Sequence, residues 1–215
     1  MNKLSTKDCV VVLLSISAII LGCWTVTENW IAMAQLAKEI KINAQQQLEN
    51  WYMMFQRVLF ILLGGVSLLR VLAAQRTVSL QKFFYGVGAA VAAVYTLLVI
   101  VDASSLMAMF IPHEMWNDIT YVVELTMYIL YLAIGITALA LCVAAVREKT
   151  RHQQQLGMLL LVWIGLAVFP LFVFAVRYYQ FNAGMWIRVV AGLAVQAVFQ
   201  IGAAYGAFCH QRHEA

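Results

Sequence analysis

The chain has 215 residues, of which 64% are hydrophobic and 11% are charged, with a net charge of +4. Soluble domains have about 25% charged residues, so this chain has too few to cover a surface in water. The excess of apolar side chains indicates a membrane protein, and the charge does not suggest nucleic-acid binding. We expect a single membrane domain over residues 1–215, because little sequence lies outside the apolar stretches.

Six apolar stretches have about the length that a transmembrane helix needs, which is roughly 20 residues. Apolar and polar residues do not alternate in them, so they predict an all-α polytopic bundle and not a β-barrel. Lys3 and Lys7 precede the first stretch as in a signal peptide, but Asp8 favours an uncleaved spanning helix. The six stretches are Cys9–Val26, Tyr52–Ala74, Phe83–Val101, Ile119–Val146, Leu156–Val176 and Val189–Cys209, with Ile111 as an alternative end for the third.

Lysine and arginine in the loops predict the orientation of the six helices. Nine of these bases fall on the side that contains both termini and the loops after the second and fourth stretches, whereas five fall on the other side. Cytoplasmic loops are enriched in bases, so both termini are expected in the cytoplasm. The compact chain with few long loops suggests the inner (cytoplasmic) membrane of a bacterial cell.

The residues between the first two stretches, Thr27–Asn50, contain neither glycine nor proline and place apolar residues at helical spacing. We expect them to form an amphipathic helix on the outer membrane surface, flanked by Trp30 and Trp51, which suit the interface. The same pattern also fits an outward extension of the first or the second spanning helix.

Small residues are concentrated in the third and sixth stretches, where Gly202 and Gly206 form a GxxxG pair. Such faces let two helices approach closely in lipid. We therefore expect these two helices to contact each other or to lie at the centre of the bundle, with Gly88, Ala92 and the GxxxG pair buried. The same faces could instead mediate dimerisation.

Five ionisable residues are predicted at a similar depth toward the outer side, and they are the candidates for a ligand site. They are Arg57, Asp102, Glu124, Arg177 and Arg188. A charge in hydrocarbon costs about 2.5–3.5 kcal/mol or more, so an embedded charge is usually paired or functional. We expect Arg57 to form a salt bridge with Asp102 or Glu124, and Arg177 or Arg188 to pair with Glu124. Alternatively, most of these groups lie at the interface, where long arginine side chains reach water.

No motif in the sequence identifies a reaction. The four cysteines have no CxxC spacing and the four histidines lie outside the apolar stretches, so no metal, haem or other cofactor is expected. Tyrosines and tryptophans, among them Tyr128 and Tyr131, concentrate toward the outer side, which an aromatic belt at the interface explains better than stacking on a ligand. Pro170 should kink the fifth helix.

The leading hypothesis is a small transport protein, or the membrane subunit of one, that binds a small polar or ionic solute from the outer side. The alternative is a non-catalytic membrane partner, such as an assembly, immunity or exclusion protein or an accessory subunit. A lipid-modifying enzyme ranks last, because no nucleophile, base and metal set can be named and no catalytic residue is predicted. The expected partners are the lipid bilayer, such a solute, and a homo-oligomer or protein complex.

Overall fold

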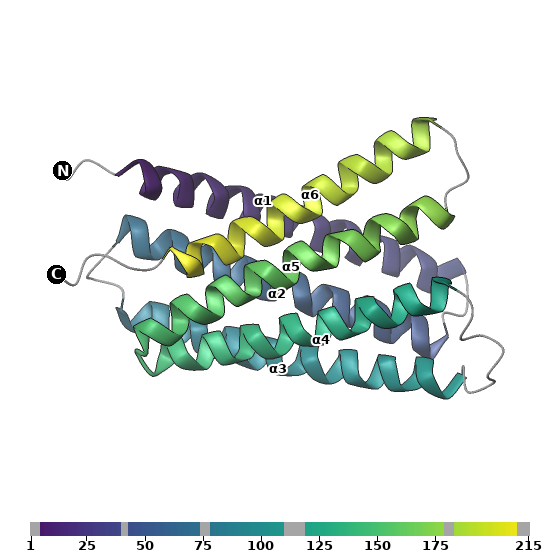
Figure 1. Cartoon of the computed structure of the whole chain (residues 1–215), viewed down its shortest axis with the longest axis horizontal. Coiled ribbons are helices and arrows are strands. Elements are labelled where there is room, and N and C mark those ends of the chain that lie inside the picture. The colour runs from purple at the N-terminus through teal and green to yellow at the C-terminus, as the bar shows by residue number, and fades with distance from the viewer. Residues whose placement is uncertain (1–4, 40–42, 74–77, 110–118, 179–182, 210–215) are drawn as a thin grey trace.

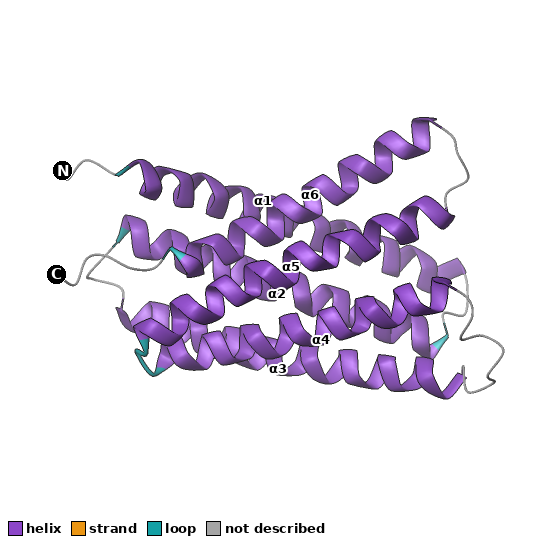
Figure 2. Cartoon of the chain, in the orientation of Figure 1, coloured by secondary structure: helices purple, strands orange, loops and turns teal. Residues whose placement is uncertain are grey.

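The computed structural model describes residues 5–39, 43–73, 78–109, 119–178 and 183–209. Side chains are described over the same ranges, except at 36–39, 106–109, 119–120, 174–178, 183–186 and 188. Within these ranges the chain forms six α-helices and no strand, as the apolar stretches predict (Figure 2). The helices are α1 (Thr6–Glu39), α2 (Ala44–Leu72), α3 (Val78–Met109), α4 (Ile119–Val146), α5 (Thr150–Tyr178) and α6 (Ala183–Phe208).

Consecutive helices run in opposite directions and pack side by side (Figure 1). The arrangement closes on itself because α6 returns to pack against α1 and also contacts α2. With an even number of helices, α1 begins and α6 ends at the same end of the bundle (Figure 1). We call this the terminal end and the opposite one the distal end.

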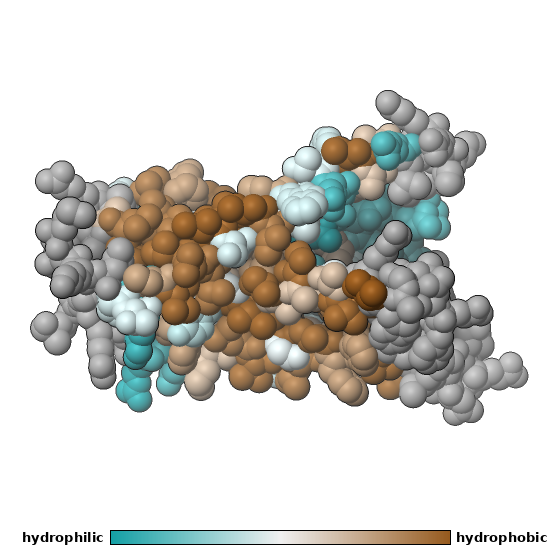
Figure 3. All heavy atoms as spheres, turned by 90° about the horizontal axis from the view of Figure 1, so that it is seen from above, coloured by the Kyte–Doolittle hydropathy of each residue, from teal (hydrophilic) through white to brown (hydrophobic). Residues whose placement is uncertain are grey.

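Each helix contains a stretch of 20 to 30 residues that is long and apolar enough to cross a membrane. Large apolar side chains such as Leu13, Leu97 and Phe169 are exposed, and hydrophobic surface covers the middle of the molecule (Figure 3). Such a continuous apolar surface is unfavourable in water and is satisfied by lipid. The chain is therefore a multi-pass membrane protein in contact with the bilayer.

The segment Thr27–Asn50 does not form the separate surface helix that its pattern predicts. Instead α1 continues to Glu39, and α2 already begins at Ala44 after an N-cap at Asn43. The Asn43 side chain accepts a 2.8 Å hydrogen bond from the backbone N–H of Gln46. The described residues of this segment thus extend the first two helices beyond their apolar stretches, which agrees with the second expected arrangement. Helical spacing shows that a helix forms but not in which direction it runs, and no glycine or proline ends α1 earlier.

The four small residues predicted to be buried in the third and sixth helices are all buried: Gly88, Ala92, Gly202 and Gly206. Extensive packing of α3 on α6 is nevertheless not found in the described part of the chain, because α3 packs on α2 and α4, and α6 on α1, α2 and α5. A Cβ on Gly202 would lie 2.8 Å from the carbonyl oxygen of Leu14 in α1, and one on Gly88 would lie 3.2 Å from Sγ of Cys142 in α4. Composition indicates close contacts here, but it does not identify the partner helix.

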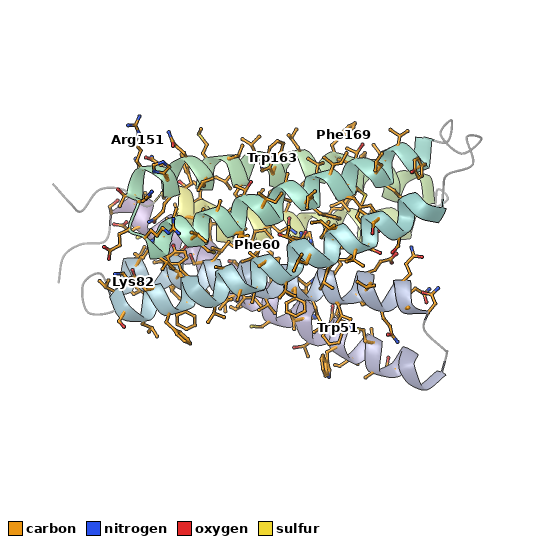
Figure 4. The ribbon with its side chains drawn as sticks, turned by 90° about the horizontal axis from the view of Figure 1, so that it is seen from below. Trp51, Phe60, Lys82, Arg151, Trp163 and Phe169 are labelled. Atoms are coloured by element: carbon orange, nitrogen blue, oxygen red, sulfur yellow. The ribbon has the colours of Figure 1, made fainter. Side chains whose placement is uncertain are left out.

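Basic side chains lie at the terminal end, where Figure 4 shows Lys82 and Arg151. Nζ of Lys82 forms an exposed ion pair with Glu148 at 2.6 Å. Glu148 has a φ of 56°, and the backbone N–H groups of Glu148 and Lys149 donate to the carbonyls of Ala145 and Ala144. A left-handed residue with these two hydrogen bonds commonly ends a helix. Glu148 therefore ends α4, and α5 begins two residues later, at Thr150.

Candidate ligand-binding site

A buried carboxylate lies on α3, in the half of the helix nearer the distal end. Asp102 is 1% exposed, and its Oδ2 accepts a 2.8 Å hydrogen bond from the hydroxyl of Tyr128 on α4. Its other oxygen, Oδ1, is buried and has no hydrogen-bond partner among the described residues. Burial of an incompletely paired carboxylate inside a membrane bundle is costly, so Asp102 is a candidate functional residue.

Tyrosine rings from three helices meet beside this carboxylate. The ring centroid of Tyr52 on α2 lies 6.3 Å from that of Tyr95 on α3, and 6.4 Å and 6.1 Å from those of Tyr128 and Tyr131 on α4. Nε2 of Gln56 donates to the Tyr95 hydroxyl at 3.1 Å, while Oε1 of Gln56 is buried without a partner. We define the distal polar cluster as Tyr52, Gln56, Tyr95, Asp102, Tyr128 and Tyr131.

Two more carboxylates lie near this cluster. Glu49 is half-buried, and it precedes Tyr52 by one turn of α2. Glu49 lies within charge-interaction range of Asp102 and of Glu124. The two acidic groups Asp102 and Glu49 favour the approach of a cation over that of an anion.

Arg57 does not belong to the distal polar cluster. Its Nη1 donates to the backbone carbonyl of Thr25 in α1 at 3.0 Å, and the acid that acts on its charge is Glu28, also in α1. The predicted salt bridge to Asp102 or Glu124 is therefore not formed. Arg57 follows Gln56 by one residue, which on a helix turns its side chain by about 100°, away from α3 and toward α1.

The structure describes the side chains of only some of the other predicted site residues. Glu124 is half-buried near the start of α4 and lies close enough to Glu49 for their charges to interact. Arg177 and Arg188 belong to the last turn of α5 and the first turns of α6, but their side chains lie outside the described residues. Their pairing with Glu124 stays a prediction. The structure thus brings Asp102 and Glu124 toward a common region and leaves Arg57 outside it.

Most of the distal polar cluster is absent from the predicted site. Tyr52, Gln56 and Tyr95 are not singled out by any motif, and Tyr128 and Tyr131 are predicted to lie in an interfacial belt. The structure instead buries Tyr131 at 4% exposure and bonds Tyr128 to Asp102.

Helical spacing contains a signal that could have found these residues. Gln56 follows Tyr52 by four positions, Asp102 follows Tyr95 by seven, and Tyr128 follows Glu124 by four. Residues at these spacings share one helix face. Polar residues that share a face of an otherwise apolar span indicate a polar contact inside the bundle.

A second buried polar contact lies toward the terminal end. Nη2 of Arg70 donates to Oε1 of Gln153 on α5 at 3.0 Å, and the guanidinium carbon lies 4.8 Å from the centroid of the Tyr85 ring on α3. A cation above a ring and an amide partner both stabilise a guanidinium. Because these groups link α2, α3 and α5, we attribute this contact to packing of the bundle.

Comparison of the chain with protein families, with characterised proteins and with solved structures finds no match. Any function must therefore be inferred from the chemistry of the distal polar cluster.

Proposed function

We propose that the protein is a small transport protein, or the membrane subunit of one, that binds a small polar or ionic solute at the distal polar cluster. The observation that supports this proposal is the buried Oδ1 of Asp102, which has no partner in the described structure. An apolar residue at this depth would stabilise the bundle better, since a buried carboxylate is costly unless it is fully paired. A bound solute supplies the missing partner.

We further propose that the distal end faces outward and that both termini lie in the cytoplasm of a bacterial inner membrane. Basic residues at the terminal end support this orientation through the enrichment of bases in cytoplasmic loops. They include Lys82, Arg147, Lys149 and Arg151. In this orientation the solute reaches the distal polar cluster from the outer side.

The orientation predicts the outcome of reporter fusions. A reporter that is active only outside the cytoplasm should be active after Asp118 or Asn182, and silent after Arg76, Gln153 or the C-terminus. The reason is that each loop must alternate sides along a chain of six spans. An active C-terminal fusion together with silent fusions after Asp118 and Asn182 would invert the proposed orientation.

Solute binding is tested by thermal unfolding of the purified protein in lipid nanodiscs, with sodium, methylammonium, glycine, glucose or phosphate added at equal ionic strength. A ligand at about five times its dissociation constant adds about 1 kcal/mol of stability. For a chain of this size that raises the unfolding temperature by roughly 2–4 °C. We expect at least one solute to produce such a rise in the wild type but not in Asp102→Asn.

Glu148→Gln is the matched control, because it removes an exposed carboxylate far from the cluster, at the terminal end, and should keep the full response. The solute that binds is then offered to proteoliposomes, where uptake by the wild type and not by Asp102→Asn distinguishes transport from binding alone. The proposal would be contradicted if no solute raised the unfolding temperature, or if the rise were equal in Asp102→Asn and the wild type.

A partner role is the second candidate, and the distal half of α6 favours it. Here α1 and α6 diverge (Figure 1), and Ala191, Gly192 and Ala194 are exposed. A Cβ on Gly192 would meet no atom within 4 Å. Small residues on a membrane-facing surface are typical of helix–helix contacts, so an assembly or accessory role becomes the better choice if the solute panel fails.

A further inference from the structure

We propose that the solute is a small primary ammonium ion, whose NH3+ group binds Asp102 among the rings of the distal polar cluster. This inference rests on the proposed function and adds the chemical class of the ligand. It starts from the two unpartnered groups of the cluster, Oδ1 of Asp102 and Oε1 of Gln56, which are both hydrogen-bond acceptors. The missing partner must therefore be a donor, and a carboxylate forms its strongest hydrogen bonds with a donor that carries a positive charge. A primary ammonium group has three N–H donors and no acceptor.

The aromatic side chains favour an organic cation. The Tyr52 ring has three other tyrosine rings with centroids within 6.1–6.4 Å, and an ammonium group that lies over such rings gains cation–π attraction. The desolvated setting increases this attraction, because Tyr52, Tyr95 and Tyr131 are all buried. The rings also provide an apolar surface for the carbon atoms of the ligand.

A metal ion fits the cluster less well. Calcium and magnesium require about six oxygen ligands, whereas Asp102 offers one unpartnered carboxylate oxygen. No group of three or more His, Cys, Asp or Glu residues that could hold a metal occurs in the part of the chain that the structure describes. The described residues therefore offer calcium or magnesium too few ligands, whereas the tyrosine rings suit an ammonium ion.

Access to the cluster is from the distal end. Asp102 is 1% exposed, so the ligand must displace a side chain to reach it. Tyr128 is half-buried and bonds Oδ2 of Asp102, so rotation of its ring frees both carboxylate oxygens for the ammonium group. Glu49 precedes Tyr52 by one turn of α2 toward the distal end, where its charge attracts a cation.

The test is equilibrium binding of radiolabelled methylammonium to the purified full-length protein in lipid nanodiscs. We expect saturable binding that ethylammonium displaces, that tetramethylammonium displaces at least tenfold less well, and that methanol does not displace. Tetramethylammonium has the charge but no N–H donor, and methanol has a donor but no charge. This comparison uses the wild type alone and does not depend on whether any variant folds.

Variants then locate the site. Asp102→Asn should weaken methylammonium binding at least tenfold, whereas the control Glu148→Gln should bind like the wild type. Tyr52→Leu removes one of the aromatic rings and should weaken binding severalfold. Each variant is compared only after its elution volume and unfolding transition match those of a folded protein.

The outcomes separate this inference from the proposed function. Tighter binding of tetramethylammonium than of methylammonium would overturn the requirement for N–H donors. Binding of sodium, glycine or another solute that depends on Asp102, with no binding of methylammonium, would overturn the ligand class and leave the proposed function standing. If no solute binds in a manner that depends on Asp102, both the ligand class and the proposed function are wrong.

Discussion

Gly202→Leu should lower the free energy of unfolding by about 1–3 kcal/mol, the usual cost of overpacking. A Cβ at this position would lie 2.8 Å from the carbonyl oxygen of Leu14 and 3.5 Å from the Cβ of Leu14. A backbone oxygen cannot rotate out of the way as a side chain can, so α1 and α6 must move apart. That movement would also loosen the next contact along α6, where Gly206 packs on Ser67 of α2.

Gly192→Leu is the matched control, because it introduces the same side chain into the same helix. A Cβ on Gly192 would meet no atom within 4 Å, so we expect a change within about 0.5 kcal/mol. Denaturant unfolding in mixed micelles, followed by far-ultraviolet circular dichroism, measures both variants. Equal losses at the two positions would show that the close approach of α1 and α6 is not what stabilises the bundle.

The number and order of the helices could be predicted from the sequence, because a bilayer requires apolar runs of a fixed minimum length. Helix ends could not, since polar turns continue a helix beyond the hydrocarbon without any apolar signal. The second apolar stretch begins at Tyr52, for example, whereas α2 begins at Ala44. α3 continues past Asp102 to Met109, which agrees with the longer of the two expected ends of the third stretch.

The contacts within the candidate site could not be predicted from the sequence. Asp102 and Arg57 lie on two of the long apolar helices, but predicting whether they pair requires knowing the rotation of each helix about its axis. Rotation is decided by packing among neighbours, and the large buried rings of Tyr52 and Tyr95 fix the α2–α3 contact. Arg57 then faces α1, where the carbonyl of Thr25 accepts its hydrogen bond.

Tyr128→Phe should destabilise the protein by about 1.5–3 kcal/mol, the range for a hydrogen bond to a charged group. The change keeps the ring and removes only the hydroxyl that donates to Oδ2 of Asp102. Since Oδ1 already has no partner in the described structure, the whole carboxylate would then be buried without a donor. Unfolding in mixed micelles measures the loss.

A double-mutant cycle assigns this loss to the carboxylate. In an Asp102→Leu background the buried charge is absent, so Tyr128→Phe should cost little, and the coupling energy between the two positions should approach the full loss. Arg57→Met should instead add to Asp102→Leu within about 0.5 kcal/mol, because Arg57 bonds α1 and does not touch Asp102. Strong coupling of Arg57 to Asp102, with none between Asp102 and Tyr128, would contradict this assignment. It would indicate instead the salt bridge between Arg57 and Asp102 that the sequence predicts. It would also remove the basis for a cation at this carboxylate, since Arg57 would already neutralise it.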